Sequence, residues 1–389
     1  KFVNYDELFD YDMDYSNRGR RAPKVSNFKG EQKFSSIILS LIENRKSIIY
    51  YTVGHNELPF DYQQTNNDAE KKNLAFFKQE IIEKNNFELK ELSANFNKIP
   101  NDCAILLIAA PQFDFNDLEI SSLKNYIANG GRLFVLLEPS LAKKDSPLNK
   151  LIGLLKEVNI NFQNVLVIDK SNMLPLFGAG AIIAESIGNN EITDNLVKYK
   201  LPVFLNICAA FEITQTNDKK NAITTQALLT TSPNAFAKTD LTNLKKIEFN
   251  QAQDKSGIMN LAVLSTGKLI EKNANTIIKQ DTDTALTTDT ANLAANQTQP
   301  SEFKIVAIAD ADLFSENLAQ NAGNYTLAGN IINYLADKKD LISVPPKSPE
   351  KTQLTLSNSD MSSIFMFTVV ILPIFAVISG IIVWRRRRA

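Results

Sequence analysis

The chain has 389 residues, of which 44% are apolar, so it is long enough to form two domains of ordinary size. Its 42 Lys and Arg residues nearly balance its 43 Asp and Glu residues, for a formal net charge of −1. Four of the basic residues are consecutive at the C-terminus, and the rest form no basic field, which excludes nucleic acid as a partner because its recognition needs clustered Lys and Arg.

The N-terminal part begins with a polar stretch and then alternates between two kinds of apolar pattern. Residues 1–29 are polar and irregular, and we expect them to form a solvated lead-in, the remnant of a missing N-terminal portion. Apolar residues at helical spacing predict helices at 30–44 and 68–85. Short apolar runs predict buried strands at 47–53 and 87–90, and the first of these ends in a tight loop.

The next segment repeats this alternation and adds a clear helix end. A fully apolar run predicts a strand at 103–109, and the spacing that follows predicts a helix at 117–129. Gly130 and Gly131 come directly after that helix, where a glycine cap is expected, and another strand is predicted at 133–137. Strands and helices that alternate through short connections predict parallel strands with helices on both faces. We therefore expect an α/β fold with an open, doubly wound, mostly parallel sheet of the flavodoxin-like kind.

The later segments continue this fold up to residue 336. Helical spacing predicts helices at 148–158 and 324–336. Apolar runs predict strands at 165–168, 203–205, 226–229, 258–264 and 304–308. Residues 271–301 are rich in Thr, Asp, Asn, Ala and Gln and have little to bury, so we expect a disordered or solvated insertion. The expected α/β domain therefore covers 30–336, and the prolines within 337–362 predict a stiff linker.

The C-terminal stretch has the length and the flanks of a membrane span. No charged residue occurs from Ile364 to Trp384, and a helix of about 20 apolar residues crosses a bilayer. Pro373 and Gly380 are tolerated inside a span, and Trp384 stands where an interfacial aromatic residue is expected. Under the positive-inside rule, the cytoplasmic side is marked by Arg385, Arg386, Arg387 and Arg388. We therefore expect 363–389 to be a single transmembrane helix with a cytoplasmic arginine tail, in the inner (cytoplasmic) membrane, with the bulk of the chain in the periplasm or otherwise outside the cytoplasm.

Polar and aromatic residues stand just after several predicted strands. In a doubly wound fold, the loops at the carboxyl ends of the strands gather into one crevice, where ligands bind. We expect this crevice to bind a ligand or a partner through His55, Glu57, Phe113, Glu138, Asp310 and Asp312.

His55 is the only histidine and the best single candidate for acid–base chemistry. Catalysis by His55 needs a nucleophile or a metal beside it, and the sequence has no second histidine, paired cysteine motif, nucleophile elbow or phosphate-binding loop. We therefore predict no catalytic residue, no metal site and no cofactor. Asp310 and Asp312 fit a helix cap better than a cation site, because two carboxylates alone make a poor metal site. Cys103 and Cys208 lie in apolar runs, which favours buried free thiols over a disulfide.

Six stretches, taken in order, resemble one known family. They are the helix that starts at Gly30, the strand and turn at 49–57, the segment 99–133, the stretch 229–236, the segments 309–313 and 330–335, and the arginine-flanked C-terminus. In this order they resemble the GldG-like proteins, the extracytoplasmic auxiliary components of gliding-motility-type ABC transport systems. Two features differ from that family: its own first membrane segment is missing before Lys1, and the 271–301 insertion is unusually long.

The resemblance implies a non-enzymatic accessory subunit of an ABC-type transport or gliding-motility complex, with an amidotransferase-like domain that lacks the nucleophile of that class. Such a subunit docks on a permease, and through it on a cytoplasmic ATPase, beside the lipid bilayer, and it binds an envelope protein, an envelope polymer or a substrate. Two alternatives stay open. One is a membrane-tethered hydrolase or sugar-binding enzyme that uses His55 with Glu57 or Glu138, and the other is a structural stalk in the envelope.

Overall fold

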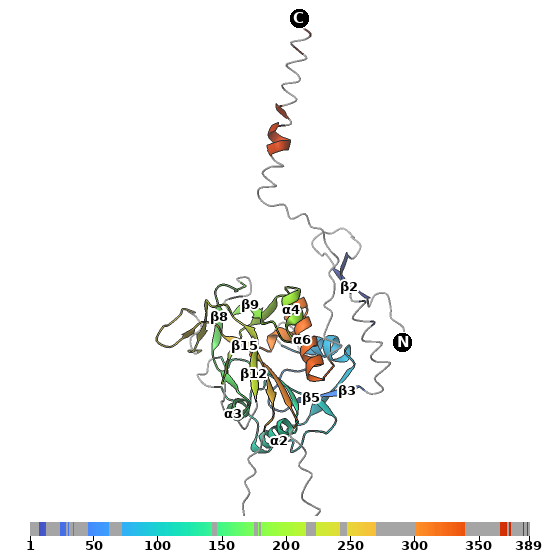
Figure 1. The fold of residues 1–389 in the computed structure, drawn as a ribbon, viewed down its shortest axis with the longest axis vertical. Coiled ribbons are helices and arrows are strands. Elements are labelled where there is room, and N and C mark those ends of the chain that lie inside the picture. Colours follow the sequence, from blue (N-terminus) through green and yellow to red (C-terminus); the bar gives the residue numbers. More distant parts are fainter. Residues whose placement is uncertain are drawn as a thin grey trace, which may run out of the picture. The chain divides into compact units, whose positions relative to one another are not determined.

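The structure of the protein is a computed structural model, and it divides into two units (Figure 1). One unit comprises residues 1–8 and 29–346, and the other comprises residues 9–28 and 347–389. The structure describes residues 8–12, 24–28, 30, 34, 46–61, 72–141, 146–174, 178, 180–214, 223–241, 247–269, 301–338, 366–371, 373–374, 384 and 387.

The first unit is built on one large sheet of 11 strands together with a small sheet of three strands. The strands are β3 (Ser47–Thr52), β4 (Phe87–Leu92), β5 (Cys103–Ala109), β6 (Arg132–Leu136), β7 (Ile160–Gln163), β8 (Leu166–Asp169), β9 (Ala181–Ser186), β10 (Val203–Asn206), β11 (Ala210–Ile213), β12 (Thr224–Thr230), β13 (Ala235–Lys238), β14 (Lys255–Ser256), β15 (Asn260–Gly267) and β16 (Phe303–Ile308). The helices are the π-helix η2 (Phe77–Glu83), α2 (Asp117–Ala128), α3 (Asn149–Glu157), α4 (Asp194–Lys198), the 3-10 helix η4 (Asp312–Phe314), α5 (Glu316–Ala319) and α6 (Ala322–Leu335).

The large sheet changes from parallel to antiparallel at β16. Along its main path the strand order is β10-β9-β12-β15-β16-β6-β5-β3-β4. From β16 to β4 all neighbours run parallel. On the other side β16 pairs antiparallel with β15, and the antiparallel pattern continues through β12, β9 and β10. The strands β11 and β7 extend the antiparallel half from β15.

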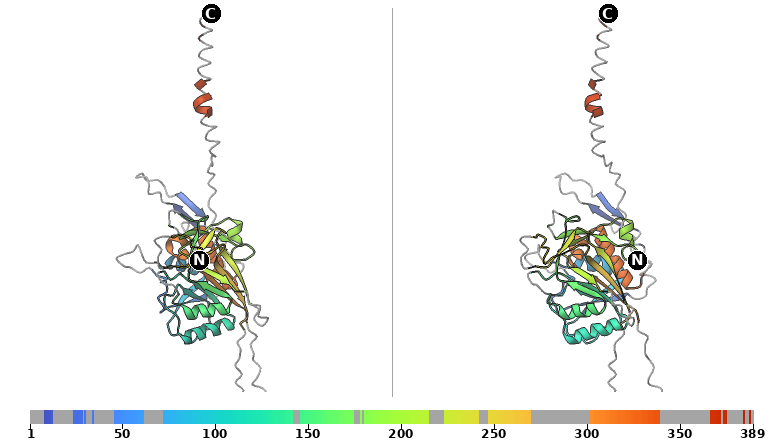
Figure 2. Two further views of the ribbon diagram at one scale, coloured as in Figure 1. Left: turned by 90° about the vertical axis from the view of Figure 1, so that its left-hand side faces the viewer. Right: turned by 60° about the vertical axis from the view of Figure 1, so that its left-hand side comes forward.

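Strand β5 shows how the sheet separates two hydrophobic cores. Ile105 and Leu107 pack into one core, and Leu106 and Ile108 pack into the other, all of them fully buried. Helices η2 and α6 contribute to the first core, and α2 and α3 contribute to the second, where Figure 2 shows them side by side. A parallel strand that is covered on both faces needs apolar residues at every position, which explains the uninterrupted apolar run of β5.

The elements predicted for the parallel half are confirmed, with shifted ends. The strands β3, β4, β5, β6 and β16 and the helices α2, α3 and α6 match predicted segments. The helix expected at 68–85 is shorter, because residues 72–74 have no regular secondary structure, residues 75–76 are helical and η2 spans Phe77–Glu83. The helix expected at 30–44 lies outside the described residues, apart from Gly30 and Phe34. The 271–301 insertion, apart from Ser301, and most of the 337–362 linker also lie outside them.

The expectation of a doubly wound, mostly parallel sheet is wrong. The sheet is mixed, and its antiparallel half comprises β7, β9, β10, β11, β12 and β15, whereas β8, β13 and β14 form the small sheet. The cause is visible in the connections, because the five-residue α4 is the only helix of the described chain between β7 and β15. A crossover between parallel strands needs a dozen or more residues, usually a helix, whereas antiparallel strands are joined by short turns. Several of the strands involved were also missed from the sequence, namely β7, β9, β11, β13 and β14.

The expected transmembrane helix is the second correction. Among the helices that the structure describes, none has both the length and the apolar character that crossing a bilayer requires. Of the residues expected to form the anchor, Pro373, Trp384 and Arg387 are described, and the others lie outside the described residues: Ile364, Gly380, Arg385, Arg386 and Arg388.

In its described residues, the second unit includes a short hairpin and a helical segment. The hairpin pairs β1 (Phe9–Asp12) with β2 (Lys24–Phe28) in antiparallel register, with an irregularity between Asp10 and Tyr11. The helical segment is the π-helix η6 (Met366–Ile371). The hairpin lies within residues 1–29, where the sequence shows no strand pattern.

The glycine cap of α2 predicts a loss of stability on substitution by alanine, and a second glycine provides a control in which alanine should increase stability. Gly130 has φ +82° and donates its N–H to the Ile127 carbonyl at 3.0 Å, and a Cβ there would collide with Ser301. We expect Gly130→Ala to lower the free energy of unfolding by about 1–2 kcal/mol, since a left-handed backbone is costly for alanine. Gly153 lies inside α3 with no atom near an added Cβ, so Gly153→Ala is expected to stabilise by about 0.5–1 kcal/mol. Urea unfolding measures the change in the free energy of unfolding for each variant. Equal stabilities of the two variants would contradict the role of Gly130 as a glycine cap.

Candidate functional site

His55 lies in the loop after β3, between two carboxylates. Its Nδ1 is 3.1 Å from Glu57 Oε1, and its Nε2 is 3.1 Å from Glu119 Oε2. The imidazole stacks on the Phe115 ring with 3.9 Å between centroids and 25° between planes. His55 is only 6% exposed, so these contacts replace water around the ring. Because carboxylates only accept hydrogen bonds, satisfying both ring nitrogens requires the doubly protonated imidazolium.

Backbone N–H groups fix both carboxylates in place. Glu57 Oε2 accepts from the His55 N–H at 2.7 Å. Glu119 Oε1 accepts from the Asn95 N–H at 2.7 Å, and its Oε2 accepts from the Asn116 N–H at 2.8 Å. Asn116 is the N-cap of α2 and forms a capping box with Glu119. The loops after β3 and β4 and the start of α2 therefore meet at the buried Glu119 carboxylate.

The electrostatics of this cluster favour the charged imidazole. Burial lowers the pKa of His55, but the hydrogen bonds and charges of Glu57 and Glu119 outweigh burial and raise this pKa above its ordinary value. Burial raises the pKa of Glu57, but hydrogen bonds from His55, from backbone N–H groups and from Thr52 outweigh it and lower this pKa. An imidazolium with both nitrogens donating has no lone pair to take up a proton, so His55 positions the surrounding loops.

Three other residues of the expected crevice meet at the carboxyl ends of β6 and β16. Glu138, Asp310 and Asp312 each offer a carboxylate oxygen, and these oxygens lie within 4.8 Å of one another. Asp310 is fully buried and accepts at 2.6 Å from the N–H groups of Asn206 and Asp312. Lys72 Nζ is 2.7 Å from Asp312 Oδ1 and 3.3 Å from Glu138 Oε1. One ammonium group therefore pairs with two of these three carboxylates.

Burial, together with neighbouring negative charge, raises two carboxyl pKa values in this second cluster. Burial raises the pKa of Glu138, and Asp312 adds to the rise against the opposing effect of Lys72. Burial, followed by the charge of Asp312, raises the pKa of Asp310 well above its ordinary value. Oxygen ligands of this type suit a proton or a hard cation, and the Lys72 ammonium is the cation present. Asp310 also satisfies the N–H of the first residue of η4, so it acts at the helix start.

Phe113 lies beside a cavity at the carboxyl end of β3. Its N–H donates to the His55 carbonyl at 3.1 Å, but its side chain is 64% exposed. The cavity has a volume of about 560 Å³, and we call it the β3-end pocket. Its lining includes Tyr51, Glu57, Phe60, Asp61, Glu91 and Phe113.

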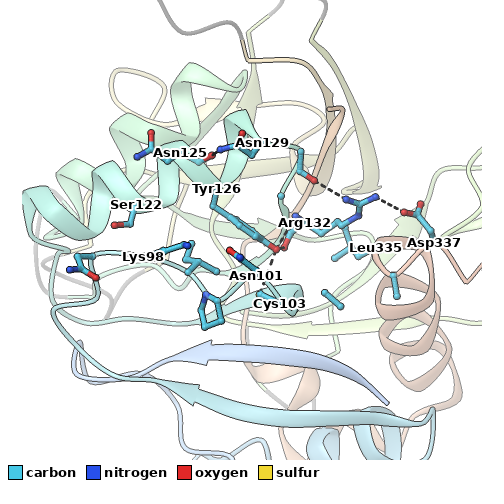
Figure 3. A pocket seen from close by; sticks show the side chains of 17 residues that line it. Lys98, Asn101, Cys103, Ser122, Asn125, Tyr126, Asn129, Arg132, Leu335 and Asp337 are labelled. Atoms are coloured by element: carbon cyan, nitrogen blue, oxygen red, sulfur yellow. Dashed lines mark hydrogen bonds and ion pairs between the residues drawn. The ribbon is translucent and has the colours of Figure 1, made fainter. Parts of the chain in front are cut away.

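A larger cavity of about 880 Å³ lies where β5 and β6 begin, at the opposite ends of these strands (Figure 3). Arg132 donates to the Gly130 carbonyl at 2.8 Å and to Asp337 Oδ2 at 2.5 Å. The Tyr126 hydroxyl donates to the Arg132 carbonyl at 3.1 Å and lies 3.6 Å from Cys103 Sγ. Burial raises the pKa of Cys103 to about 11, so this thiol is a poor nucleophile. Cys103 and Cys208 are both free, as the sequence favours.

Comparison with known proteins assigns a family to this fold and site. A family model described as an ABC-type uncharacterized transport system, for its auxiliary component, matches residues 45–342. The chain belongs to this family. The match includes both carboxylate clusters and both cavities, and the resemblance to an ABC-transport auxiliary component is confirmed. The link to gliding motility stays a prediction.

Two solved structures are similar to this ABC-transport auxiliary protein. The mmIFT52 N-terminal domain has a TM-score of 0.46 at 14% identity, over 74% of this chain and 97% of that chain. The exo-beta-1,4-mannosidase Op5Man5 from Opitutaceae bacterium strain TAV5 has a TM-score of 0.33 at 11% identity, over 80% of this chain. The alignment spans only 40% of the mannosidase. No curated protein matches the chain.

The expected crevice of the ABC-transport auxiliary protein is divided in two. His55 and Glu57 lie at the end of β3, whereas Glu138, Asp310 and Asp312 lie at the ends of β6 and β16. Both groups follow the carboxyl edge of the parallel half, with β5 between them in the strand order.

Sequence reasoning missed two residues of these clusters. Glu119 stands three positions after Asn116, the spacing of a capping box, and this signal identifies it as a helix-start acid. Its contact with His55 depends on the tertiary fold. No local pattern signals Lys72, which reaches Glu138 and Asp312 from a distant part of the sequence.

Proposed function

We propose that this ABC-transport auxiliary protein is a non-enzymatic subunit that docks on the permease of its transport system and binds a partner in the cell envelope. The loops at the carboxyl ends of β3 and β5 form the binding surface. The family match over residues 45–342 carries this proposal. As the family resemblance implies, we place the subunit on the outer side of the cytoplasmic membrane.

Two details of the site support binding over catalysis. His55 has both ring nitrogens on carboxylates, so it lacks the free nitrogen that a general base needs. Of the two carboxylates that the hydrolase alternative pairs with His55, Glu57 contacts its Nδ1 at 3.1 Å, whereas Glu138 belongs to the other cluster. Phe113, in contrast, presents an aromatic side chain that is 64% exposed, and exposed aromatic residues are typical anchors of protein interfaces.

Purification of the tagged full-length protein in mild detergent, followed by mass spectrometry, tests this function. We expect a polytopic permease and a cytoplasmic ATPase to copurify with the wild-type protein. We expect Phe113→Ala to reduce recovery of the envelope partner about tenfold, because loss of one interface anchor commonly costs more than 1 kcal/mol.

A second exposed apolar residue provides the matched control. Ile258 is 61% exposed and does not line the β3-end pocket, so Ile258→Ala should leave recovery unchanged. Copurification of neither permease nor ATPase would overturn the proposed function. Equal losses with Phe113→Ala and Ile258→Ala would overturn the assignment of the binding surface.

A further inference from the structure

The β3-end pocket is acidic on the side of β4. Glu91 and Asp61 line it, and none of the described residues that line it is Lys or Arg. Asp61 pairs at 2.7 Å with Lys78, which lies outside the lining, and Glu57 pairs with His55. Among the described residues, Glu91 forms no ion pair, and its carboxylate contacts the Tyr51 hydroxyl. It therefore offers an uncompensated negative charge to a ligand in the pocket.

Aromatic rings form the other part of the lining. Tyr51 and Phe60 lie with ring centroids 4.5 Å apart and ring planes inclined by 53°. The Tyr51 hydroxyl donates to Glu91 Oε1 at 2.7 Å, which leaves Glu91 Oε2 free of this contact. Phe113 adds the exposed ring described above. A flat cation that enters the pocket would meet ring faces as well as a carboxylate.

The geometry points to a binding site for the side chain of an arginine from a protein partner in the β3-end pocket. A guanidinium group is planar, stacks on aromatic rings and donates two parallel hydrogen bonds to a carboxylate. Glu91 supplies the carboxylate, and Tyr51 and Phe113 supply the rings. This inference rests on the proposed function, since it gives the chemistry of the partner that binds there.

The buried cluster of His55, Glu57 and Glu119 fixes the position of one wall of the pocket. Glu57 belongs to both the pocket and this cluster, because it lines the pocket and also accepts from the backbone N–H and Nδ1 of His55. Through His55 this wall is joined to Glu119 and the start of α2. Gly54, with φ +107°, packs so closely on Ala94 that a Cβ would collide with it. A pocket with fixed walls loses little conformational entropy when an arginine binds.

The test uses two small probes of similar shape, one charged and one neutral. N-acetyl-arginine amide carries the guanidinium, and N-acetyl-citrulline amide replaces it with a neutral urea of the same shape. Their binding to the full-length protein is measured by saturation-transfer NMR titration at about 0.15 M salt, where weak surface attraction is screened. We expect the arginine probe to bind about fivefold more tightly, because its ion pair with the exposed Glu91 carboxylate is lost in citrulline and exposed ion pairs are weak.

Two variants on the same strand locate the probe. Glu91→Gln removes the charge and keeps an acceptor for Tyr51, so it should weaken the arginine probe about fivefold and leave the citrulline probe unchanged. Glu88→Gln is the control, because Glu88 is on β4 but outside the lining. Equal binding of both probes, or equal effects of both variants, would overturn the inference. If the permease and ATPase still copurify with the protein in that case, the proposed function stands and only the partner chemistry is wrong.

Discussion

Glu119→Ala is expected to lower the free energy of unfolding by about 3–5 kcal/mol, the cost of leaving a buried charge without its partner. Glu119 is 1% exposed, and its carboxylate accepts from His55, Asn95 and Asn116. Alanine leaves two partly buried backbone N–H groups and one imidazolium nitrogen without the Glu119 acceptor, and each unsatisfied group adds its own penalty. Urea unfolding of the full chain, followed by circular dichroism, measures the loss.

Two further variants separate the buried network from a general effect of removing a charge. Glu119→Gln keeps one oxygen acceptor and the side-chain volume, so its loss should lie between those of the wild type and the alanine variant. Glu157 forms a half-exposed ion pair with Lys124 at 2.7 Å, so Glu157→Ala should cost at most about 1 kcal/mol. A loss for Glu119→Ala as small as that for Glu157→Ala would contradict the role of Glu119 as a link between α2 and the loops after β3 and β4.

The parallel half of the fold was predictable because each of its strands has a local signature. β5 is apolar at all seven positions, which only a strand buried on both faces requires. The helix α2 carries its own start and stop signals in Asn116 and Gly130. In the antiparallel half, β7 and β11 have four residues each, and their pairing to each other spans about fifty residues of sequence. Such pairing depends on tertiary contacts, so local pattern gave no sign of it.

The site was predictable only as far as strand order determines position. Residues at the carboxyl ends of parallel strands lie along one edge, so His55 and Asp310 could be assigned to that edge from sequence. The residues on this edge divide into two clusters because Glu119 of α2 contacts His55 and Lys72, in the segment before η2, contacts Asp312. The resulting balance of charge, and with it the protonation of His55, follows from the three-dimensional arrangement alone.

Stability is expected to fall as the pH rises through the pKa of His55 in the folded protein. The ordinary imidazole pKa is about 6.5. Burial of His55 would lower this value, but Glu57 and Glu119 outweigh burial and hold the proton to higher pH. Below the unfolded pKa both states bind the proton, so the full stabilisation by the two carboxylates is present. Above the folded pKa neither state binds it, and this stabilisation is lost. The fall therefore begins near pH 6.5 and continues to the raised value.

His55→Gln isolates this contribution from other titrating groups. Glutamine leaves Glu57 and Glu119 buried without their shared cation, at a cost of about 3–5 kcal/mol at pH 6, and the difference from wild type should shrink as the pH rises. Urea unfolding between pH 6 and pH 8 measures the difference, and this range stays below the ordinary cysteine pKa of about 8.5. Because His55 is the only histidine, its imidazole proton NMR signal reports the folded pKa without assignment. A constant difference between the two proteins, with an ordinary pKa, would contradict the stabilisation of the His55 imidazolium by Glu57 and Glu119.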